Sequence, residues 1–420
     1  MIFCQWTDRT GRPTSLERND IFAMRSFSLC SSALALFALP ALAGPSADNT
    51  CTPLANGFAA IDDSPAINAA LVECGAGGTI VLPADQAYSI FTPLDFSLCR
   101  HCDVQIEGTL ILAAEQLPYY GTLPYYANGA TRSVFTIANA TGVRIRSVTG
   151  SGVVDGNAVS WYQRTKWSPK TGGYPFVHVT NGSTDVSVEN LHFKNIQDRV
   201  FRLQGGSSNL RFEDVRITAE GINPNYASFD NFAFEMGKVE NVSIANVDID
   251  FGAQTGSDRP VGTCVSFDHG TDGVAVANVT CRRAFMGAAI QFDTISAFAP
   301  SAANATATVS NILVSNFTFA GAHATGVESW FNLSKKVIRN AVWEWVTVEG
   351  GTPAEFDPCY ASMRDTQYYP RCLQYATYDA EVVFRHYRGK VGSPPTDPRW
   401  GEVNGLMDVR PVFEDWVADA

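Results

Sequence analysis

Residues 239–249 read VENVSIANVDI, and four further stretches of the chain repeat this pattern. Each stretch has two short runs in which apolar residues alternate, separated by a pair such as Glu189-Asn190. Alternation with a period of two is typical of β-strands, and the intervening pair predicts a sharp turn. The other four stretches are Ser183–Phe193, Ser207–Ile217, Thr271–Cys281 and Val309–Phe319.

The second turn residue of each stretch sets the repeat length. It recurs at Asn190, Asp214, Asn246, Asn278 and Asn316, at intervals of 24, 32, 32 and 38 residues. Such a period indicates stacked units that bury their apolar sides against their neighbours. Because no helix separates the strands of a unit, we expect an all-β fold, a parallel β-helix with insertions on the ligand-binding face. The alternative, an antiparallel sandwich, needs hairpin turns at each junction.

The best candidate for a helix is Ser64–Cys74, which reads SPAINAALVEC. Asp63 is its expected N-cap, and Pro65 stands in its first turn. A helix there would cover the open end of the solenoid. We expect one β-helix domain over residues 44–351, followed by an irregular C-terminal tail over residues 352–420 that packs on the last coils.

The N-terminal residues have the composition of a targeting sequence. Met24-Arg25 begins a positively charged segment, Leu29–Leu39 is largely apolar, and Ala41–Ala43 is a small-residue cleavage site. Residues 24–43 are therefore predicted to be a secretory signal peptide, since the apolar run is too short to span a bilayer. Residues 1–23 are predicted to be an upstream extension, and the mature protein is expected to be a secreted monomer.

The chain has 420 residues and a formal net charge of −12. Such an acidic protein is a poor partner for nucleic acid or an anionic membrane, and neither is expected. It also repels an anionic polymer unless its groove carries local positive charge. The sequence has no nucleotide-binding loop, no G-x-S-x-G and no H-E-x-x-H phrase, and no cofactor is expected.

Eight cysteines follow the predicted signal peptide, and an even number in a secreted chain is typical of disulfide bonds. Sequence proximity predicts the pairs Cys51–Cys74, Cys99–Cys102, Cys264–Cys281 and Cys359–Cys372, although the first two pairs could exchange partners. No second C-x-x-C phrase exists, so no zinc site is predicted. Seven N-x-S/T motifs predict N-glycosylation and favour a eukaryotic secretory route. They begin at Asn139, Asn181, Asn241, Asn278, Asn304, Asn316 and Asn332.

From Asp62 onward, the order of several short phrases resembles the pectinase-type glycoside hydrolases of family 28. Asp63–Ile67, Cys74–Thr79 and Val81–Pro83 resemble the family's N-terminal cap, while Ile106–Leu110 and Gly152–Asn157 resemble its first coils. The resemblance spans roughly residues 50–350. It implies a right-handed parallel β-helix of the pectin-lyase-like kind, with a groove along one sheet and activity on pectic polysaccharide.

The family's chemistry uses the phrases N-T-D, D-D, G-H-G and R-I-K on successive coils. Its three aspartates serve as general acid and as holders of the attacking water, and its Arg and Lys hold a substrate carboxylate. The matching positions here carry other residues: Ala227 for N-T-D, Gly262 and Thr263 for D-D, Met286 for the histidine, and Glu328 and Trp330 for Arg and Lys. We expect a divergent member without ordinary polygalacturonase activity, because a galacturonate carboxylate would meet the like charge of Glu328.

Three carboxylates on the groove strands are candidates for a relocated catalytic site. Aligning the strands by their inward aromatics stacks Phe234, Phe267, Phe292 and Phe331 inside the solenoid. That register stacks Glu235, Asp268 and Asp293 outside, about 4.8 Å apart per rung, where neighbours suit a retaining pair and rungs two apart approach the inverting range. Their mutual repulsion would raise one pKa, as a general acid requires. Alternatively, each side chain caps its own backbone where the strand enters a turn.

Other groove residues are predicted to contact the ligand. His178 and Arg202 have outward parity on preceding coils, although either is alternatively an ordinary surface residue. Aromatic faces bind sugars and equally bind apolar metabolites. Trp343 and Trp345 alternate in a strand and are expected to share one face under the tail. The predicted substrate-binding residues are His178, Arg202, Phe229, Asn231, Phe285, Met286, Gln291, Glu328 and Trp330.

Three functions fit these patterns. The first is a secreted carbohydrate-active enzyme with relocated acids, acting on a neutral or unusual glycan rather than on polygalacturonate. The second is a biosynthetic enzyme whose groove shapes an apolar small molecule for cyclisation without hydrolysis. The third is a glycan-binding protein without catalysis. The fold favours the first, so the expected partner is a glycan, with an apolar small molecule as the alternative.

Overall fold

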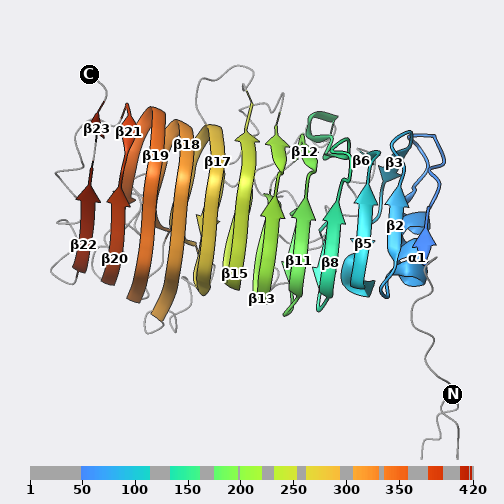
Figure 1. Ribbon diagram of the computed structural model, residues 1–420, viewed down its shortest axis with the longest axis horizontal. Helices are drawn as coiled ribbons and strands as arrows, with labels where there is room; N and C mark the ends of the chain where they lie inside the picture. Colours follow the sequence, from blue (N-terminus) through green and yellow to red (C-terminus); the bar gives the residue numbers. More distant parts are fainter. Residues whose placement is uncertain are drawn as a thin grey trace, which may run out of the picture. The chain divides into compact units, whose positions relative to one another are not determined.

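The strands of each repeat pair in parallel with the corresponding strands of the next repeat. Val242 faces Val274, which faces Ile312 on the following coil, so the apolar alternation of the repeat lines one interior surface. Figure 1 shows the strands side by side along the stack. The chain is a right-handed parallel β-helix, which confirms the expected fold class.

The computed structural model describes residues 49–113, 133–160, 175–196, 199–219, 231–252, 262–293, 306–330, 335–357, 377–390, 407–415 and 417–418. All of them lie in the unit Pro45–Ala420, and the predicted signal peptide and upstream extension lie outside them. The elements are β1 (Thr50–Cys51), α1 (Ser64–Cys74), β2 (Thr79–Leu82), β3 (Ala87–Ile90), β4 (Leu94–Asp95), the 3₁₀ turn η1 (Phe96–Leu98), β5 (Arg100–Ile106), β6 (Thr109–Leu112), β7 (Phe135–Ala138), β8 (Thr141–Arg146), β9 (Val153–Asp155), β10 (Val177–Thr180), β11 (Thr184–Glu189), β12 (His192–Lys194), β13 (Arg199–Glu213), β14 (Arg216–Thr218), β15 (Phe232–Asp250), β16 (Thr263–Phe267), β17 (Thr271–Asp293), β18 (Thr306–Trp330), β19 (Lys335–Asp357), β20 (Thr377–Arg385), β21 (Arg388–Gly389), β22 (Met407–Glu414) and β23 (Val417–Ala418).

The turn inside each repeat explains why its second residue is Asn or Asp. All five of these residues have φ between 50° and 56°, in the left-handed region that Asn and Asp tolerate better than most side chains. Three of them form a stack that we call the turn ladder, made of Asn246, Asn278 and Asn316. Asn278 Nδ2 donates to Asn246 Oδ1 at 3.1 Å, and Asn316 Nδ2 donates to Asn278 Oδ1 at 3.2 Å.

The row of the turn ladder continues into Trp345, because the residues on either side of Asn316 face those on either side of Trp345. Trp345 has φ of 55° and is 43% exposed, whereas Trp343 is fully buried. The Trp343 indole nitrogen donates to the carbonyl of Ala288 at 3.1 Å. The prediction that the two tryptophans share one face is wrong, because the left-handed backbone at Trp345 interrupts the alternation of the strand.

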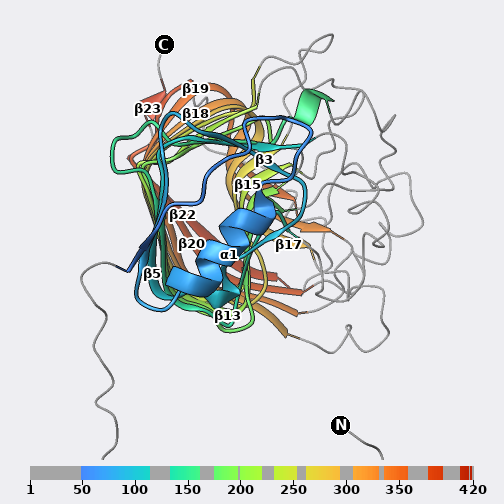
Figure 2. The same ribbon diagram turned by 90° about the vertical axis from the view of Figure 1, so that its right-hand side faces the viewer.

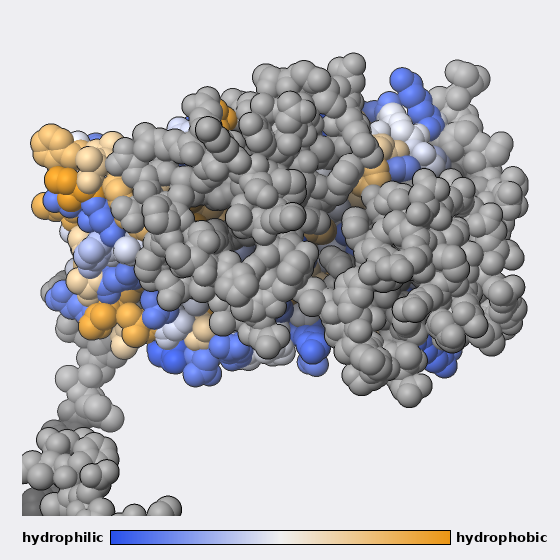
Figure 3. All heavy atoms as spheres, turned by 180° about the vertical axis from the view of Figure 1, so that it is seen from behind, coloured by the Kyte–Doolittle hydropathy of each residue, from blue (hydrophilic) through white to orange (hydrophobic). Residues whose placement is uncertain are grey.

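Helix α1 lies across the N-terminal end of the coils, as Figure 2 shows, and its predicted limits are confirmed. Its own residues Ile67, Leu71 and Cys74 are buried. Asp63 occupies the N-cap position, but its carboxylate accepts the backbone N–H groups of Asn56 and Ser89, each at 2.8 Å, instead of capping the helix. Figure 3 shows apolar surface at this end of the stack, and exposed large hydrophobic residues occur here: Leu54, Phe58, Ile61 and Val72.

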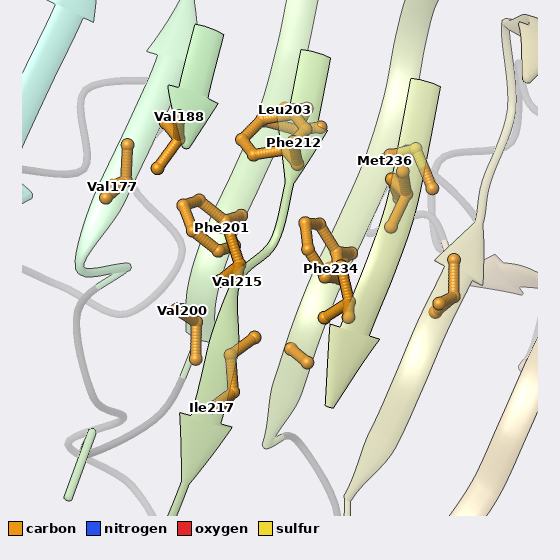
Figure 4. Close-up of a cluster of buried hydrophobic side chains, with 14 of the residues drawn as sticks. Val177, Val188, Val200, Phe201, Leu203, Phe212, Val215, Ile217, Phe234 and Met236 are labelled. Carbon is orange, nitrogen blue, oxygen red and sulfur yellow. The ribbon is translucent and has the colours of Figure 1, made fainter. Parts of the chain in front are cut away.

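The interior is a continuous core in which aromatic rings on successive coils touch. Phe201 stacks on Phe234 with ring centroids 4.9 Å apart and planes 18° apart, and Phe212 packs against both rings (Figure 4). All three side chains are fully buried. Burial of such rings is a dominant source of the stability of the solenoid.

Three of the four predicted disulfides are present. They are Cys51–Cys74, Cys99–Cys102 and Cys264–Cys281. The first joins α1 to β1 and ties the cap to the first coil. Cys359 and Cys372 lie outside the described residues.

The coils continue beyond residue 351, where an irregular tail was predicted. Strand β20 pairs with β19, and β22 pairs with β20, all in parallel. Phe384 stacks on both Trp343 and Phe413, so the aromatic interior also continues. The prediction of an irregular tail is therefore wrong for these described strands, since they pair as regular coils. In β20 the buried residues repeat the inward apolar alternation of the earlier coils: Tyr378, Ala380, Val382 and Phe384.

Candidate functional site

Two rows of outward-facing side chains cross strands β10, β13, β15, β16, β17 and β18. Along each strand these positions alternate with buried apolar residues such as Phe201, Phe234 and Val265, as the geometry of a strand requires. The first row consists of His178, Arg202, Glu235, Ser266, Ala289 and Gly326. The second row consists of Thr180, Gln204, Gly237, Asp268, Gln291 and Glu328. Each of them follows the first-row residue of the same coil by two positions.

The predicted stack of three carboxylates is wrong in its register. Glu235 faces Ser266, and Asp268 lies two residues beyond Ser266, in the second row. The interior explains the shift: Phe234 faces Val265, and Phe267 faces Ile290. Phe234, Phe267 and Phe292 are buried as expected, but they do not form one ladder, because Val, Ile and Met also fill inward positions.

Glu235 is held by two guanidinium groups from strand β13. Arg199 Nε lies 2.7 Å and Arg202 Nε lies 3.1 Å from the same carboxylate oxygen, Oε2. Burial alone would raise the pKa of Glu235, but the charges of Arg199 and Arg202 and the hydrogen bond from Arg199 outweigh it and lower the pKa. Glu235 therefore stays ionised and is poorly suited to donate a proton.

His178 and Gln204 connect the two rows. The Nε2 atom of His178 lies 2.7 Å from Nε2 of Gln204, and His178 faces Arg202 on the neighbouring strand. His178 is 2% exposed, so it is a buried member of a polar network rather than a freely solvated surface residue. The prediction that His178 and Arg202 lie on the same outer face is in agreement with this geometry.

Asp268 takes part in a turn at the end of its strand. Its Oδ1 accepts the backbone N–H of His269 at 2.6 Å, which is the backbone-capping alternative raised by the sequence. His269 turns away and accepts the backbone N–H of Thr308 on its Nδ1 at 3.1 Å. Burial, together with the charge of Lys238, lowers the pKa of His269.

Gln291 and Glu328 form a buried polar pair in the second row. Gln291 Nε2 donates to Glu328 Oε2 at 2.9 Å, and the two residues are 7% and 2% exposed. Within the described part of the chain, Gln291 Oε1 and Asn231 Nδ2 are buried without a hydrogen-bond partner. Buried polar atoms of this kind are costly unless something else satisfies them, so both mark places where a ligand or water would bind.

The structure also locates the positions matched to the family's motifs. Thr263 lies beside Met286 on the next strand and beside Phe232 on the preceding one, and Met286 faces His323. The ring of Phe285 packs edge-on against His323 with centroids 5.0 Å apart. The residue next to Thr263 on the preceding coil is thus Phe232, whereas Ala227 lies outside the described residues.

Several predicted site residues are not described. Phe229 lies outside the described residues, and the side chains of Asp293 and Trp330 are not described, although their backbones pair with each other. Two residues of this region were not predicted, Arg199 and His323. Arg199 has the parity of an inward-facing residue, so its contact with Glu235 was not expected. No single phrase of the sequence would have singled out either residue.

Among the predicted glycosylation sites, Asn139 and Asn181 are exposed, and Asn304 and Asn332 lie outside the described residues. The other three, Asn241, Asn278 and Asn316, donate their side-chain N–H groups to asparagines on the preceding coil.

Within the described ranges, no three His, Cys, Asp or Glu side chains are grouped to hold a metal ion. No described helix has the length and hydrophobicity needed to cross a membrane.

The fold and the polar rows on one sheet place the chain in the class of pectin-lyase-like parallel β-helix proteins. The model of the glycosyl hydrolases family 28 matches residues 78–324. The chain belongs to that family.

Relatives support the same assignment. A probable endo-xylogalacturonan hydrolase A of Aspergillus fumigatus is 29% identical over 345 residues, covering 74% of this chain and 80% of the relative. A protein of the same name from Aspergillus flavus is 34% identical over 231 residues, covering 55% and 52%.

Solved structures share the fold. The crystal structure of endo-xylogalacturonan hydrolase from Aspergillus tubingensis gives a TM-score of 0.69 at 22% identity, covering 88% of this chain and 93% of that one. The exopolygalacturonase from Thermotoga maritima gives 0.59 at 12% identity, covering 88% of each chain. At these identities the likeness concerns the architecture alone.

Proposed function

We propose that this protein is a secreted, divergent member of family 28 that acts on an unusual pectic glycan, of the xylose-bearing galacturonan kind, in preference to unsubstituted polygalacturonate. The observation that carries this proposal is the buried pair Gln291–Glu328. It stands at the position where the family resemblance implies a guanidinium for a substrate carboxylate. The names of the relatives, endo-xylogalacturonan hydrolases, support the same class of substrate.

The charge of Glu328 decides whether a charged or an uncharged sugar is preferred beside it. Glu328 is 2% exposed and accepts a hydrogen bond from Gln291. A uronate carboxylate placed against it would bring two negative groups together at low dielectric, where repulsion is stronger than in water. A sugar without a carboxylate can instead donate a hydroxyl to Glu328 or to the unpartnered Oε1 of Gln291. This end of the second row therefore favours an uncharged sugar.

For hydrolysis, the second row offers a pair of acids two coils apart. Asp268 and Glu328 flank Gln291 in this row, so their backbones are separated by about 10 Å. Inverting glycosidases hold their carboxyl groups about 6.5–9.5 Å apart, leaving room for the attacking water. In this proposal one of the two protonates the leaving oxygen and the other takes the proton of the water. Asp293 remains a predicted site residue, and Glu235 serves as an ionised partner of the arginines.

Binding without turnover is a second candidate, and the contact of Asp268 with the His269 backbone favours it. An aspartate that caps its own turn contributes to the scaffold and need not enter chemistry. The same groove would then hold a glycan without cleaving it.

The experiment incubates the purified mature protein with unsubstituted homogalacturonan, xylogalacturonan and a neutral galactan, and profiles products by mass spectrometry. We expect cleavage of xylogalacturonan, with Asp268→Asn and Glu328→Gln each reducing the rate at least about 100-fold. Asp248→Asn is the matched control, because Asp248 pairs with Arg282 elsewhere on the coil. Rapid release of galacturonic acid from homogalacturonan, or full activity in both acid variants, would contradict the proposal.

Two further readouts separate the alternatives. Affinity for xylogalacturonan with no products would favour the binding protein. N-terminal sequencing of protein from the culture medium tests secretion, and the expected first residue is Gly44.

A further inference from the structure

The row of the turn ladder changes its chemistry over the last coils of the stack. After Asn316 it continues with Trp345, His386 and Asp415, because the residues that flank each of them pair with those that flank the next. These three residues have φ between 48° and 57°. Asn and Asp tolerate this left-handed region, whereas a bulky aromatic residue there is an outlier. The backbone therefore favours asparagine at position 345, and the tryptophan needs another explanation.

Trp345, His386, Asp415 and Arg388 form a contiguous group that we call the corner cluster. The imidazole of His386 stacks on the indole of Trp345 with ring centroids 4.1 Å apart and planes 16° apart. His386 Nδ1 lies 3.1 Å from Oδ2 of Asp415. The guanidinium carbon of Arg388 lies 5.4 Å from the centroid of the Trp345 ring. The corner cluster is thus an aromatic ring with a guanidinium against it and a carboxylate bound to the stacked imidazole.

A ligand can reach the corner cluster from solvent. Trp345 is 43% exposed, the side chain of Asp415 is 72% exposed, and Arg388 is exposed as well. Trp343 is fully buried and already fills the interior beside this turn, so core packing does not account for Trp345. His386 covers one face of the indole, and the exposed surface of Trp345 belongs to the rest of the ring. An exposed aromatic ring in a strained backbone conformation points to a role in binding.

The corner cluster lies outside the groove. On the coil of Trp345, the chain reaches the second row only at Asp357, which pairs with Glu328. Gly351, with φ of 90°, lies between the two positions. Strands β21 and β23 follow His386 and Asp415, and Figure 1 shows both at the C-terminal end of the stack. A ligand on the corner cluster therefore does not compete with one bound at the two rows.

We propose that the corner cluster is a second binding site, which holds one pyranose unit of a polysaccharide. The indole surface packs against the C–H groups of the sugar ring, and Asp415 and Arg388 supply an acceptor and donors for its hydroxyl groups. A long chain that contacts both the groove and the corner cluster is held more tightly than by the groove alone. The site goes beyond the proposed function, since it binds polymer whether or not the groove cleaves it.

Native affinity electrophoresis in the cold, in gels that contain xylogalacturonan, tests the site. The wild type should be retarded, and Trp345→Asn should weaken its affinity for the polymer at least about fivefold. This change introduces the residue that the turn prefers, so the melting temperature should fall by no more than about 2 °C. Trp345→Tyr keeps an aromatic ring at the same φ and should bind within about threefold of the wild type.

Phe58→Asn is the matched control, because Phe58 is 68% exposed at the N-terminal end and undergoes the same kind of change. It should bind within about twofold of the wild type, since it leaves the corner cluster intact. The Tyr variant also decides the result if Trp345→Asn proves unstable. A purely structural role of the ring would lower the melting temperature of Trp345→Asn and leave retardation unchanged, and this result overturns the site.

The outcomes separate this inference from the proposed function. Cleavage of xylogalacturonan by a wild type whose retardation is unchanged in Trp345→Asn overturns the corner site and leaves the function standing. Retardation that Trp345→Asn loses and Trp345→Tyr keeps, in a protein that releases no products, supports the corner site and overturns hydrolysis. If the polymer does not retard the wild type, or if Phe58→Asn or Trp345→Tyr loses as much affinity as Trp345→Asn, the corner site is wrong.

Discussion

The turn ladder and the first row of the sheet face lie on the same coils and follow opposite rules. At the turn, Asn246, Asn278 and Asn316 repeat because every coil needs a left-handed residue there. On the face, the residue type changes at every coil, from His178 to Arg202 to Glu235 to Ser266. Backbone geometry fixes the first set, and nothing in the backbone fixes the second. The variable row is therefore where the chemistry of this protein is set.

The largest loss of stability is expected in the core, because its packing supports both the turn ladder and the first row. Phe234→Ala removes a ring that stacks on Phe201 and packs against Phe212. We expect the free energy of unfolding to fall by about 3–5 kcal/mol, because the cavity cannot fully collapse. Urea or guanidinium unfolding measures this loss. Phe234→Leu is the control and should lose much less; equal losses in the two variants would mean that packing on Phe201 does not matter.

A smaller effect is expected in the charged part of the first row. Glu235→Gln removes the carboxylate that Arg199 and Arg202 both contact, and we expect a loss of about 1–3 kcal/mol at pH 7, since these side chains are only partly exposed. The pKa of Glu235 is lowered in the folded state from its ordinary value of 4.5. The unfolded chain therefore binds its proton at higher pH than the folded chain does. The stabilisation is present above about pH 4.5 and is lost as the pH falls through the folded pKa.

Unfolding curves from pH 3 to 7 test this sign. The wild type should lose stability on acidification more steeply than Glu235→Gln does. Parallel pH curves for the two proteins would show that the carboxylate is not held by the arginines.

The smallest effect is expected in the turn ladder. Asn278→Ala places alanine at φ of 56° and removes both ladder hydrogen bonds of Asn278, to Asn246 and from Asn316, and we expect a loss of about 1–2 kcal/mol. Asn278→Gly removes the same side chain without the conformational penalty, so it should lose less by about 1 kcal/mol. Thermal unfolding of the two variants compares them. A more stable alanine variant would contradict the account of the turn.

Local chemistry made much of the scaffold predictable. The turn asparagines, the limits of α1 and the three described disulfides follow from short phrases and their spacing. Each of these features is decided within one coil or between adjacent segments of the chain. The outward parity of Arg202 and Glu235 was predictable for the same reason.

The register between coils was not predictable, because it depends on the way in which the chain accommodates the long segments that connect the strands. Alignment by phenylalanine misplaced Asp268 by two residues, since Val265 and Ile290 fill interior positions as well as Phe does. The contact of Arg199 with Glu235 was not predicted, because Arg199 has the parity of an inward-facing residue. It is the first residue of β13, and its Nε nevertheless donates to Glu235 Oε2. Trp345 was misjudged because a bulky residue at positive φ is rare.

The central claim is that the buried pair Gln291–Glu328 favours an uncharged sugar on its part of the second row. A crystal structure of the protein with a xylose-bearing galacturonan oligosaccharide tests it most directly. The account predicts an uncharged unit against Gln291 and Glu328. A carboxylate bound beside Glu328, or an oligosaccharide bound only away from both rows, would contradict it.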